Sequence, residues 1–537
     1  MNVTSWSTHA CCPISDLYFF LVLYISRYRT KFLVENKQVG RMEVLVVTFL
    51  TLFFASTLCF VLFSLFLYLV RIYQACNCDV CTSYLSGSWR SSFYNLCDWY
   101  TQLLRESPTG TIHVHALRNV ITSNPENVEY MLKTNFVNYP KGKPFSAILG
   151  DFLGHGIFNV DGAEWRFQRK TASMELGGAS IRQYAFDVFI AENESRLIPL
   201  LSCFALNGQV ECEETVSSRL LDLQDLFKRL SFDNICNFSF GFDPGCLDAS
   251  LPVSLLATAF DVASSISAQR ALYASPLLWK IKRFLNMGSE KRLKEATEIV
   301  KRSATEIIKQ RRKTGISDHK DLLTRFMATT DDDNYLRDIV ISFLLAGRDS
   351  VASALTGLFW LLSQNPEVVD NIREESSQVL GPGNSTSPTL EQLRKMHYLN
   401  ATVHESLRLF PPVQFDSKFA LEDDVLPDGT IVKAGTRVTY HQYAMGRMEQ
   451  VWGPNHDEFK PERWLEKGHF VPKNSFQYPV FHAGFRECLG KEIAMVEMKS
   501  VALAVVHKFN IRVPDPDFVP RFAPGLTATL RGGLVVE

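Results

Sequence analysis

The stretch FHAGFRECLGKEIAMVEMKS, Phe481 to Ser500, places one cysteine in a glycine-containing loop directly before a helical pattern. A free cysteine is most often a small buried hydrophobic residue. Here the Cys488 sulfur would lie at the start of a helix, where backbone N–H groups stabilise a thiolate and adjust its strength as a ligand. Gly484 would permit a tight loop. The pattern predicts that Cys488 is a metal ligand.

The neighbours of Cys488 favour a flat macrocycle as the group that carries the metal. Gly490 and Ala494 are four residues apart and leave one helical face free of large side chains. Arg486 can donate charge-assisted hydrogen bonds to a propionate of such a group. The segment from Phe481 to Gly490 reads F-x-x-G-x-R-x-C-x-G, which resembles the haem-binding signature of the cytochrome P-450 superfamily.

Three further motifs follow the order of that superfamily: AGRDS (Ala346 to Ser350), ESLR beginning at Glu405, and FKPERW containing Arg463. The resemblance covers the chain from about Thr111 to the C-terminus. It implies a mainly α fold with a small β-sheet region. It also implies haem b with Cys488 as the thiolate ligand to iron, and electrons from NADPH delivered by a partner reductase.

Glu405, Arg408 and Arg463 form the first group of residues that the resemblance assigns. Glu405 and Arg408 are three residues apart and share one helical face. The pattern alone would also suit a surface pair. The resemblance implies a buried three-member ion network that braces the cysteine loop and takes no part in catalysis.

The cofactor-binding side chains expected from the resemblance extend beyond the cysteine loop. The motif WRFQR places Trp165 and Arg169 four residues apart on one helical face. The resemblance makes that face a clamp on a haem propionate, while Phe481 and Gly490 also contact the cofactor. Lys418 falls where many relatives carry another cation for a propionate.

Tyr335 to Ser363 is a long apolar segment interrupted by the polar AGRDS, and it is predicted to be one extended helix. The resemblance places Asp349 and Ser350 on the distal side of the haem. There an acid beside a hydroxyl would relay the protons that cleavage of dioxygen requires. Gly347 would let oxygen or substrate approach the helix backbone.

Three residues depart from the usual pattern of the superfamily. Ser350 stands where threonine is usual, and it lacks the β-branch that fixes the side-chain rotamer. Uncoupled release of peroxide would be the cost of this substitution. Phe485 stands where proline is common. Glu487 places a carboxylate beside the thiolate and would oppose its ionisation unless it points to solvent.

The stretches NYPKGKPFSAILGDFLGHGIFNVDG, RLFPPVQFDSKFALEDDVLPDG and TYHQYAMGRMEQVWG resemble the plant microsomal fatty-acid ω-hydroxylases, most closely those that oxidise jasmonoyl-isoleucine. The resemblance implies hydroxylation of the terminal carbon of such an acid, with further oxidation to the carboxylic acid. It also implies these substrate-channel residues: Phe145, Leu149, Phe343, Ala346, Val413, Phe415 and Leu526. Lys141 and Lys143 are candidates for holding the substrate carboxylate at the channel mouth, with solvated loop lysines as the alternative.

Two other classes of function remain open. The first is a haem-thiolate isomerase or dehydratase that acts on hydroperoxides without dioxygen or reductase, against which Asp349 and Ser350 argue. The second is a non-catalytic membrane haem binder, suggested only by Glu487 and Ser350. Turnover that depends on NADPH would distinguish the three classes.

The composition argues against a nucleic-acid partner. The 537 residues include 56 Lys and Arg against 57 Asp and Glu, so the formal charge is -1 and there is no basic excess. The apolar content of 46% is enough for a sizeable core. One cysteine group is dense enough to hold a second metal, but its spacing matches no zinc pattern: Cys76, Cys78, Cys81 and Cys97.

An apolar segment predicts a membrane anchor. Val44 to Val70 contains no charged residue, and a helix of that length spans about 40 Å, enough to cross a bilayer with tilt. Basic residues upstream would hold the N-terminus in the cytosol and send the bulk of the protein across. A start at Met42 would remove them, so residues 1–41 are interpreted as an extension of doubtful origin, with a targeting segment as the alternative.

The predicted organisation is therefore an extension (1–41), a transmembrane anchor (42–72), a polar linker (73–110) and a catalytic domain (111–537). The resemblance implies a single-pass protein of the endoplasmic reticulum membrane with its catalytic domain in the cytosol. Asn-Pro pairs at Asn124 and Asn365 indicate helix starts. A Pro-Asp-Gly turn, Pro427 to Gly429, lies between β-prone runs and indicates a small sheet.

Overall fold

The computed structural model describes residues 41–73, 76, 78–205, 220–273, 275–314, 321–381 and 387–537. The chain divides into two compact units, Met1–Asn77 and Cys78–Glu537. Apart from Arg41, the expected N-terminal extension lies outside the described residues. The first unit is described as one helix, α2 (Arg41–Tyr73).

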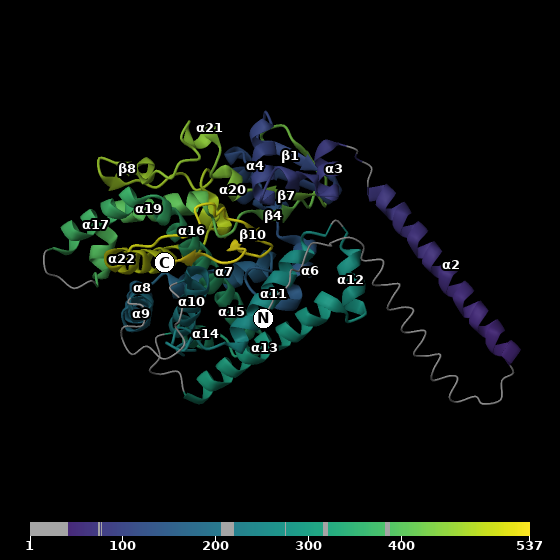
Figure 1. The fold of residues 1–537 in the computed structure, drawn as a ribbon, viewed down its shortest axis with the longest axis horizontal. Helices are drawn as coiled ribbons and strands as arrows, with labels where there is room; N and C mark the ends of the chain where they lie inside the picture. The colour runs from purple at the N-terminus through teal and green to yellow at the C-terminus, as the bar shows by residue number, and fades with distance from the viewer. Residues whose placement is uncertain are drawn as a thin grey trace. The chain divides into compact units, whose positions relative to one another are not determined.

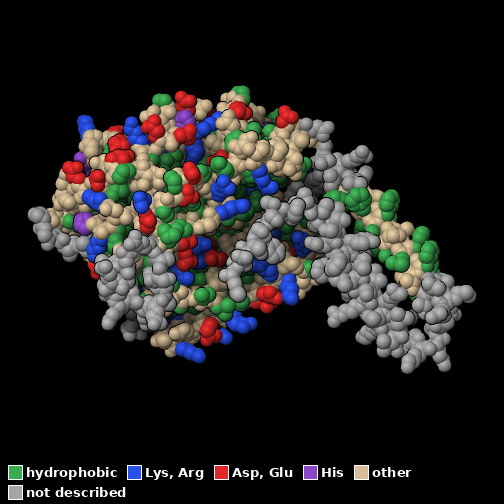
Figure 2. Space-filling model, in the orientation of Figure 1, with side chains coloured by type: hydrophobic (Ala, Val, Ile, Leu, Met, Phe, Trp, Pro, Cys, Tyr) green, Lys and Arg blue, Asp and Glu red, His purple; other side chains and the backbone are tan. Residues whose placement is uncertain are grey.

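Helix α2 carries a candidate membrane span. Val47–Phe66 has a mean hydropathy of 2.3 and none of it is buried. Its exposed apolar side chains are the green spheres along this helix in Figure 2. A second helix passes the same test, Asp333–Gln364, but 67% of it is buried, so it is a core helix and α2 is the candidate anchor.

The second unit consists mainly of helices packed around one large apolar core (Figure 1). Its α-helices are α3 (Asp79–Ser86), α4 (Leu96–Glu106), α5 (Pro125–Glu129), α6 (Gly142–Leu153), α7 (Gly162–Leu176), α8 (Ala179–Glu192), α9 (Ile198–Ala205), α10 (Leu223–Phe240), α11 (Leu255–Arg270), α12 (Leu277–Phe284), α13 (Gly288–Thr314), α14 (Leu322–Met327), α15 (Asp333–Leu344), α16 (Ser350–Gln364), α17 (Pro366–Leu380), α18 (Leu390–Lys395), α19 (His397–Leu409), α20 (Gln442–Met445), α21 (Glu449–Trp452) and α22 (Lys491–Lys508). Two signals from the sequence are confirmed, because α5 and α17 each begin at the proline of an Asn-Pro pair.

Short 3-10 and π segments connect or interrupt these helices. The 3-10 segments are η1 (Ser88–Ser91), η2 (His115–Leu117), η4 (Phe136–Asn138), η7 (Pro461–Trp464), η8 (Pro479–Phe481) and η9 (Gly484–Arg486). The π segments are η3 (Tyr130–Thr134), η5 (Asn193–Leu197) and η6 (Leu345–Asp349). Because η6 joins α15 to α16, the long helix expected from the sequence is present with a π segment in its middle.

The β structure is small and is concentrated in one four-stranded sheet of order β1-β2-β7-β4. Figure 1 shows it beside α3, α4 and α20. Its strands are β1 (Thr111–Val114), β2 (Asn119–Thr122), β7 (Arg437–Tyr440) and β4 (Asp416–Phe419). Four two-stranded pairs complete the β structure: β10 (Phe522–Ala523) with β11 (Thr529–Leu530), β12 (Val535–Val536) with β3 (Leu221–Asp222), β5 (Asp424–Val425) with β6 (Ile431–Val432), and β8 (Leu465–Glu466) with β9 (His469–Phe470).

The predicted linker is wrong over residues 79–106, which form α3 and α4 in the second unit. Trp99 and Leu104 of α4 are buried against Val114 and Ile121 of the sheet. The polar residues that suggested a linker lie on the opposite face of an amphipathic helix. The compact unit consequently begins at Cys78, well before the expected boundary at residue 111.

Gly347 has a packing role in addition to the one expected at the cavity. A Cβ at this position would lie 2.2 Å from the Cδ1 atom of Ile235 on α10, closer than two unbonded carbon atoms can come. The glycine therefore permits the close packing of η6 on α10, although its backbone also lines the cavity described below.

Candidate haem and substrate site

A cavity of about 780 Å³ lies in the second unit between the Cys488 loop, η6, α7 and the four-stranded sheet. This volume is within the range of cavities that hold small molecules. Most of the site residues predicted from the sequence line it: Phe145, Leu149, Trp165, Arg169, Phe343, Ala346, Ser350, Val413, Phe415, Phe481, Arg486, Cys488, Gly490 and Leu526. The structure thus brings together residues spread over nearly 400 positions of the chain.

The loop before α22 directs Cys488 into this cavity. The backbone N–H of Cys488 donates to the carbonyl oxygen of Phe481 at 2.7 Å and closes the loop. Gly484 has φ +62°, and a Cβ there would lie 2.3 Å from the carbonyl oxygen of Leu132. Only glycine fits that position without displacing the backbone. At Gly490 a Cβ would come within 4.0 Å of the Cys488 sulfur, so the small residue keeps the space next to the thiol open.

The groups around the Cys488 thiol shift its pKa in opposite directions. Burial raises the pKa of Cys488, while the N–H of Gly490 and the Arg169 guanidinium lower it. Glu487 was expected to oppose ionisation unless it faced solvent. It still raises the pKa of Cys488, although it is half-exposed and forms an ion pair with Lys491 at 3.6 Å. The other departure in the loop, Phe485, packs its exposed ring against Phe136.

Cationic groups line the cavity near the cysteine loop. Arg486 pairs with Asp161 at 2.5 Å and lies over the Trp165 ring at 4.5 Å. Its Nε atom is buried without a hydrogen-bond partner among the described residues. Arg169 also lines the cavity and forms no ion pair in the described part of the chain. The unpaired Nε of Arg486 and the Arg169 guanidinium, which has no ion pair among the described residues, fit a haem with carboxylate substituents next to the thiol.

Lys418 does not reach the cavity as predicted. Its Nζ is buried and donates to Asp416 at 2.6 Å. Lys141, considered above as a substrate tether, donates to the same carboxylate at 2.7 Å. Although burial opposes ionisation, the two lysines hold the pKa of Asp416 well below its ordinary value. Asp416 therefore binds both ammonium groups. Lys143 is exposed and does not line the cavity.

Glu405, Arg408 and Arg463 form the ion network expected from the motifs. Arg408 donates twice to Glu405, from Nε and Nη2 at 2.8 Å each. Arg463 Nε donates to the same carboxylate at 2.7 Å, and Trp464 Nε1 at 2.9 Å. Glu405 and Arg408 are fully buried. Trp464 packs on Tyr478, so the network supports the segment that leads into the cysteine loop.

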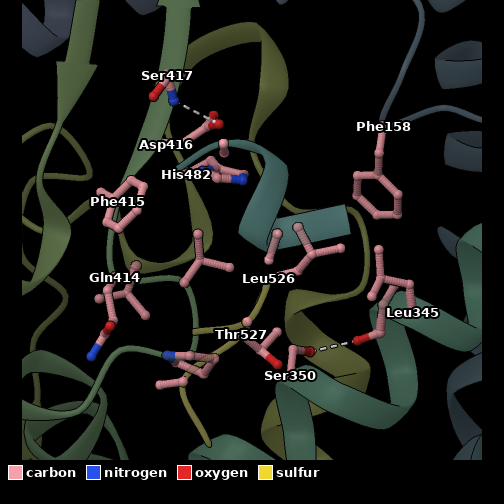
Figure 3. A pocket seen from close by; sticks show the side chains of 18 of the residues that line it. Phe158, Leu345, Ser350, Gln414, Phe415, Asp416, Ser417, His482, Leu526 and Thr527 are labelled. Atoms are coloured by element: carbon pink, nitrogen blue, oxygen red, sulfur yellow. Dashed lines mark hydrogen bonds between the residues drawn. The ribbon is translucent and has the colours of Figure 1, made fainter. Parts of the chain in front are cut away.

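Of the two residues expected to relay protons, only Ser350 lines the cavity. Its hydroxyl donates to the carbonyl oxygen of Ala346 at 2.5 Å (Figure 3), which fixes the rotamer that the missing β-branch leaves free. Asp349 lies behind it and pairs with Arg348 at 2.9 Å. Burial raises the pKa of Asp349, and Arg348 opposes that shift. Arg348 also forms an ion pair with the half-exposed Asp261 at 2.6 Å. These ion pairs connect Asp349 to the surface of the protein.

The rest of the cavity wall is mainly apolar. Figure 3 shows Phe158, Phe415 and Leu526 around the same space as Ser350. The sheet contributes polar residues to this wall that were not predicted from the sequence: Asn119, Ser417, Arg437 and Thr439. They occupy alternate positions of short strands, so only the pairing of those strands shows that they share a face.

The thiol, the small residues at the start of α22 and the two arginines beside them are the features of a haem-thiolate protein. The sequence matches the family described as Cytochrome P450 over residues 87–532. Cytochrome P450 94C1 of Arabidopsis thaliana is 56% identical over 498 residues, which cover 92% of this chain and 98% of that protein. Cytochrome P450 94B1 of the same plant is 48% identical, with coverage of 84% and 88%. Cytochrome P450 94A1 of Vicia sativa is 42% identical with the same coverage.

The chain belongs to the cytochrome P450 family. It is a haem-dependent monooxygenase, and members of this family as a rule receive electrons from NADPH through a partner reductase. When bound, the haem supplies activation of dioxygen at an iron ligated by a cysteine thiolate. Cys488, Arg169 and Arg486 are the residues of the cavity wall that would hold the haem.

Proposed function

We propose that this enzyme hydroxylates the terminal carbon of a lipid-like carboxylic acid, jasmonoyl-isoleucine or a fatty acid, and oxidises the alcohol further to the acid. The observation that carries the proposal is the mainly apolar cavity of about 780 Å³ whose wall includes Cys488. The relatives from the P450 94 group of plants support the same reading. Each hydroxylation inserts one atom of dioxygen into a C–H bond. The other atom leaves as water, using two electrons from NADPH and two protons.

The position of attack would be set by geometry. Terminal methyl C–H bonds are stronger than those of the neighbouring methylenes, so intrinsic reactivity favours attack within the chain. A channel lined by Phe145, Phe343 and Phe415 would present only the last carbon to the haem, and positioning can outweigh a preference of a few kcal/mol. In this proposal Ser350 donates a proton on the cavity side. Asp349 renews that proton and is connected to the surface through Arg348.

With purified protein, reductase and NADPH, jasmonoyl-isoleucine and dodecanoic acid are expected to yield the ω-alcohol first and the ω-carboxylate on longer incubation. Product identification by mass spectrometry tests this expectation. Mainly in-chain alcohols would contradict the regiochemistry. Conversion of hydroperoxides without NADPH would favour an isomerase instead, and the absence of any turnover with haem in place would favour a simple haem binder.

We further propose that α2 anchors the enzyme in the endoplasmic reticulum membrane as its single span, with residues 78–537 in the cytosol. In intact microsomes, added protease is expected to digest the catalytic unit without detergent. Protection that is lost only with detergent would place this unit in the lumen. Glycosylation at Asn193 is a poor test, because that side chain is buried and donates to Ser500 at 3.3 Å.

A further inference from the structure

One face of the four-stranded sheet forms part of the cavity wall and carries a connected row of polar side chains. Strand pairing sets Arg437 opposite Asn119 and Phe419, and Thr439 opposite Ser417. Thr439 Oγ1 donates to Asn119 Oδ1 at 2.8 Å, and the Ser417 and Thr439 hydroxyls are 2.8 Å apart. Figure 3 shows Ser417 next to Asp416, whose carboxylate accepts a hydrogen bond from the Ser417 backbone N–H at 2.9 Å. The guanidinium of Arg437 lies at the end of this row.

Arg437 is fixed by the sheet but has no counter-ion. Its Nε donates to Ser417 Oγ at 2.9 Å, which holds the guanidinium plane in place. Its two Nη groups have no hydrogen-bond partner, and it forms no ion pair, among the residues that the structure describes. Burial lowers the pKa of Arg437, and Tyr100, Tyr84 and the carboxylate of Asp416, which is not paired with Arg437, oppose that shift. A partly buried arginine without a paired carboxylate is costly, and this cost favours a ligand at Arg437.

The acidic groups of the cavity wall do not neutralise Arg437. Among the described lining residues the acids are Asp416 and Glu497. Asp416 is bound by Lys141 and Lys418. Burial raises the pKa of Glu497 to about 8, so it is mainly uncharged at pH 7, and it accepts a hydrogen bond from Asn234 at 2.8 Å.

The other arginines of the wall are placed differently from Arg437. Arg169 and Arg486 belong to the haem end described above, whereas three others are exposed: Arg90, Arg521 and Arg531. Arg437 alone among these described arginines combines partial burial, a fixed plane and a position on the sheet. Its two free Nη groups match the two oxygens of a carboxylate.

We propose that Arg437 binds the carboxylate of the substrate and thereby fixes which end of an acid faces the haem. This inference rests on the proposed function, because it assigns the polar end of the same substrate. It replaces Lys141 and Lys143, which the structure shows to be paired and exposed, respectively. The partly desolvated site would strengthen the ion pair relative to one in water.

The test compares acids with their methyl esters in haem-loaded Arg437→Gln protein. Spectral titration of the Soret band gives the dissociation constants of dodecanoic acid, jasmonoyl-isoleucine and both methyl esters. We expect acid binding to weaken by roughly 10- to 100-fold, with ester binding changed less than about twofold. Arg437→Lys, which keeps the charge but loses the paired geometry, should lie between the two. Lys143→Gln removes an exposed charge of the same sign and should leave both ligands unaffected.

Equal weakening of acid and ester would show a merely structural role for Arg437, and unchanged acid binding would exclude contact with the carboxylate. Loss of the carbon monoxide spectrum in both Arg437 variants would mean that Arg437 supports the haem, which also overturns the proposal. In the wild-type protein the acid must bind at least tenfold more tightly than its ester. If Arg437→Gln selectively weakens acids while the wild type makes no ω-product, the subsite stands and the proposed reaction fails.

Discussion

Cys488→Ala is expected to abolish the strongly red-shifted Soret band that the carbon monoxide complex of a haem-thiolate protein shows after reduction. The sulfur of Cys488 lines the cavity, and the N–H of Gly490 and Arg169 both favour its thiolate form. Without it the described part of the cavity wall near α22 offers no second thiol to take its place. Monooxygenase activity should fall to background, because the thiolate supplies electron density for O–O cleavage.

Cys236→Ala provides the matched control for this experiment. Cys236 is a free, fully buried thiol on α10 that does not line the cavity. Its removal should lower stability modestly and leave the absorption band in place. A red-shifted band that survives Cys488→Ala would show that another residue ligates the iron, and the assignment of the whole site would then be wrong.

The parts of the site that could be predicted are those encoded by residues close together in the chain. The conformation of the loop from Phe481 to Gly490 is determined by its own residues. Gly484 allows the left-handed turn, and the backbone N–H of Cys488 donates to the carbonyl oxygen of Phe481. Local signals also located the helix starts at Pro125 and Pro366. In each case one short stretch determines the geometry.

Contacts between distant segments could not be predicted in the same way. Lys141 and Lys418 are far apart in the chain and meet at Asp416 only after β4 and α6 have packed. Arg437 faces the cavity because β7 pairs with both β2 and β4 in one register, and a shift of one residue would turn it away. The close packing of Gly347 on Ile235 of α10 is likewise a contact that the sequence does not indicate. These roles depend on tertiary packing, which a local pattern does not contain.

Glu405→Ala is expected to destabilise the catalytic unit by about 3–5 kcal/mol, because it leaves buried arginines without their counter-charge. Glu405 accepts hydrogen bonds from Arg408, Arg463, Trp464 and the backbone N–H of Lys460, and it is fully buried. Its loss would also free the segment that supports the cysteine loop. The expected result is a low yield of haem-loaded protein and a lower temperature for loss of the Soret band.

Two further variants separate this network from ordinary surface charge. Glu129→Ala removes an exposed i,i+4 pair with Lys133 and should cost less than about 1 kcal/mol. In a double-mutant cycle, Glu405→Gln with Arg408→Met should cost clearly less than the sum of the single changes, because each single change leaves an unpaired buried group that the double variant removes. Additive losses of stability would contradict this role of the Glu405 carboxylate. A Glu405→Ala protein as stable as the Glu129→Ala protein would also show that the carboxylate does not hold Arg408, Arg463 and Trp464 together.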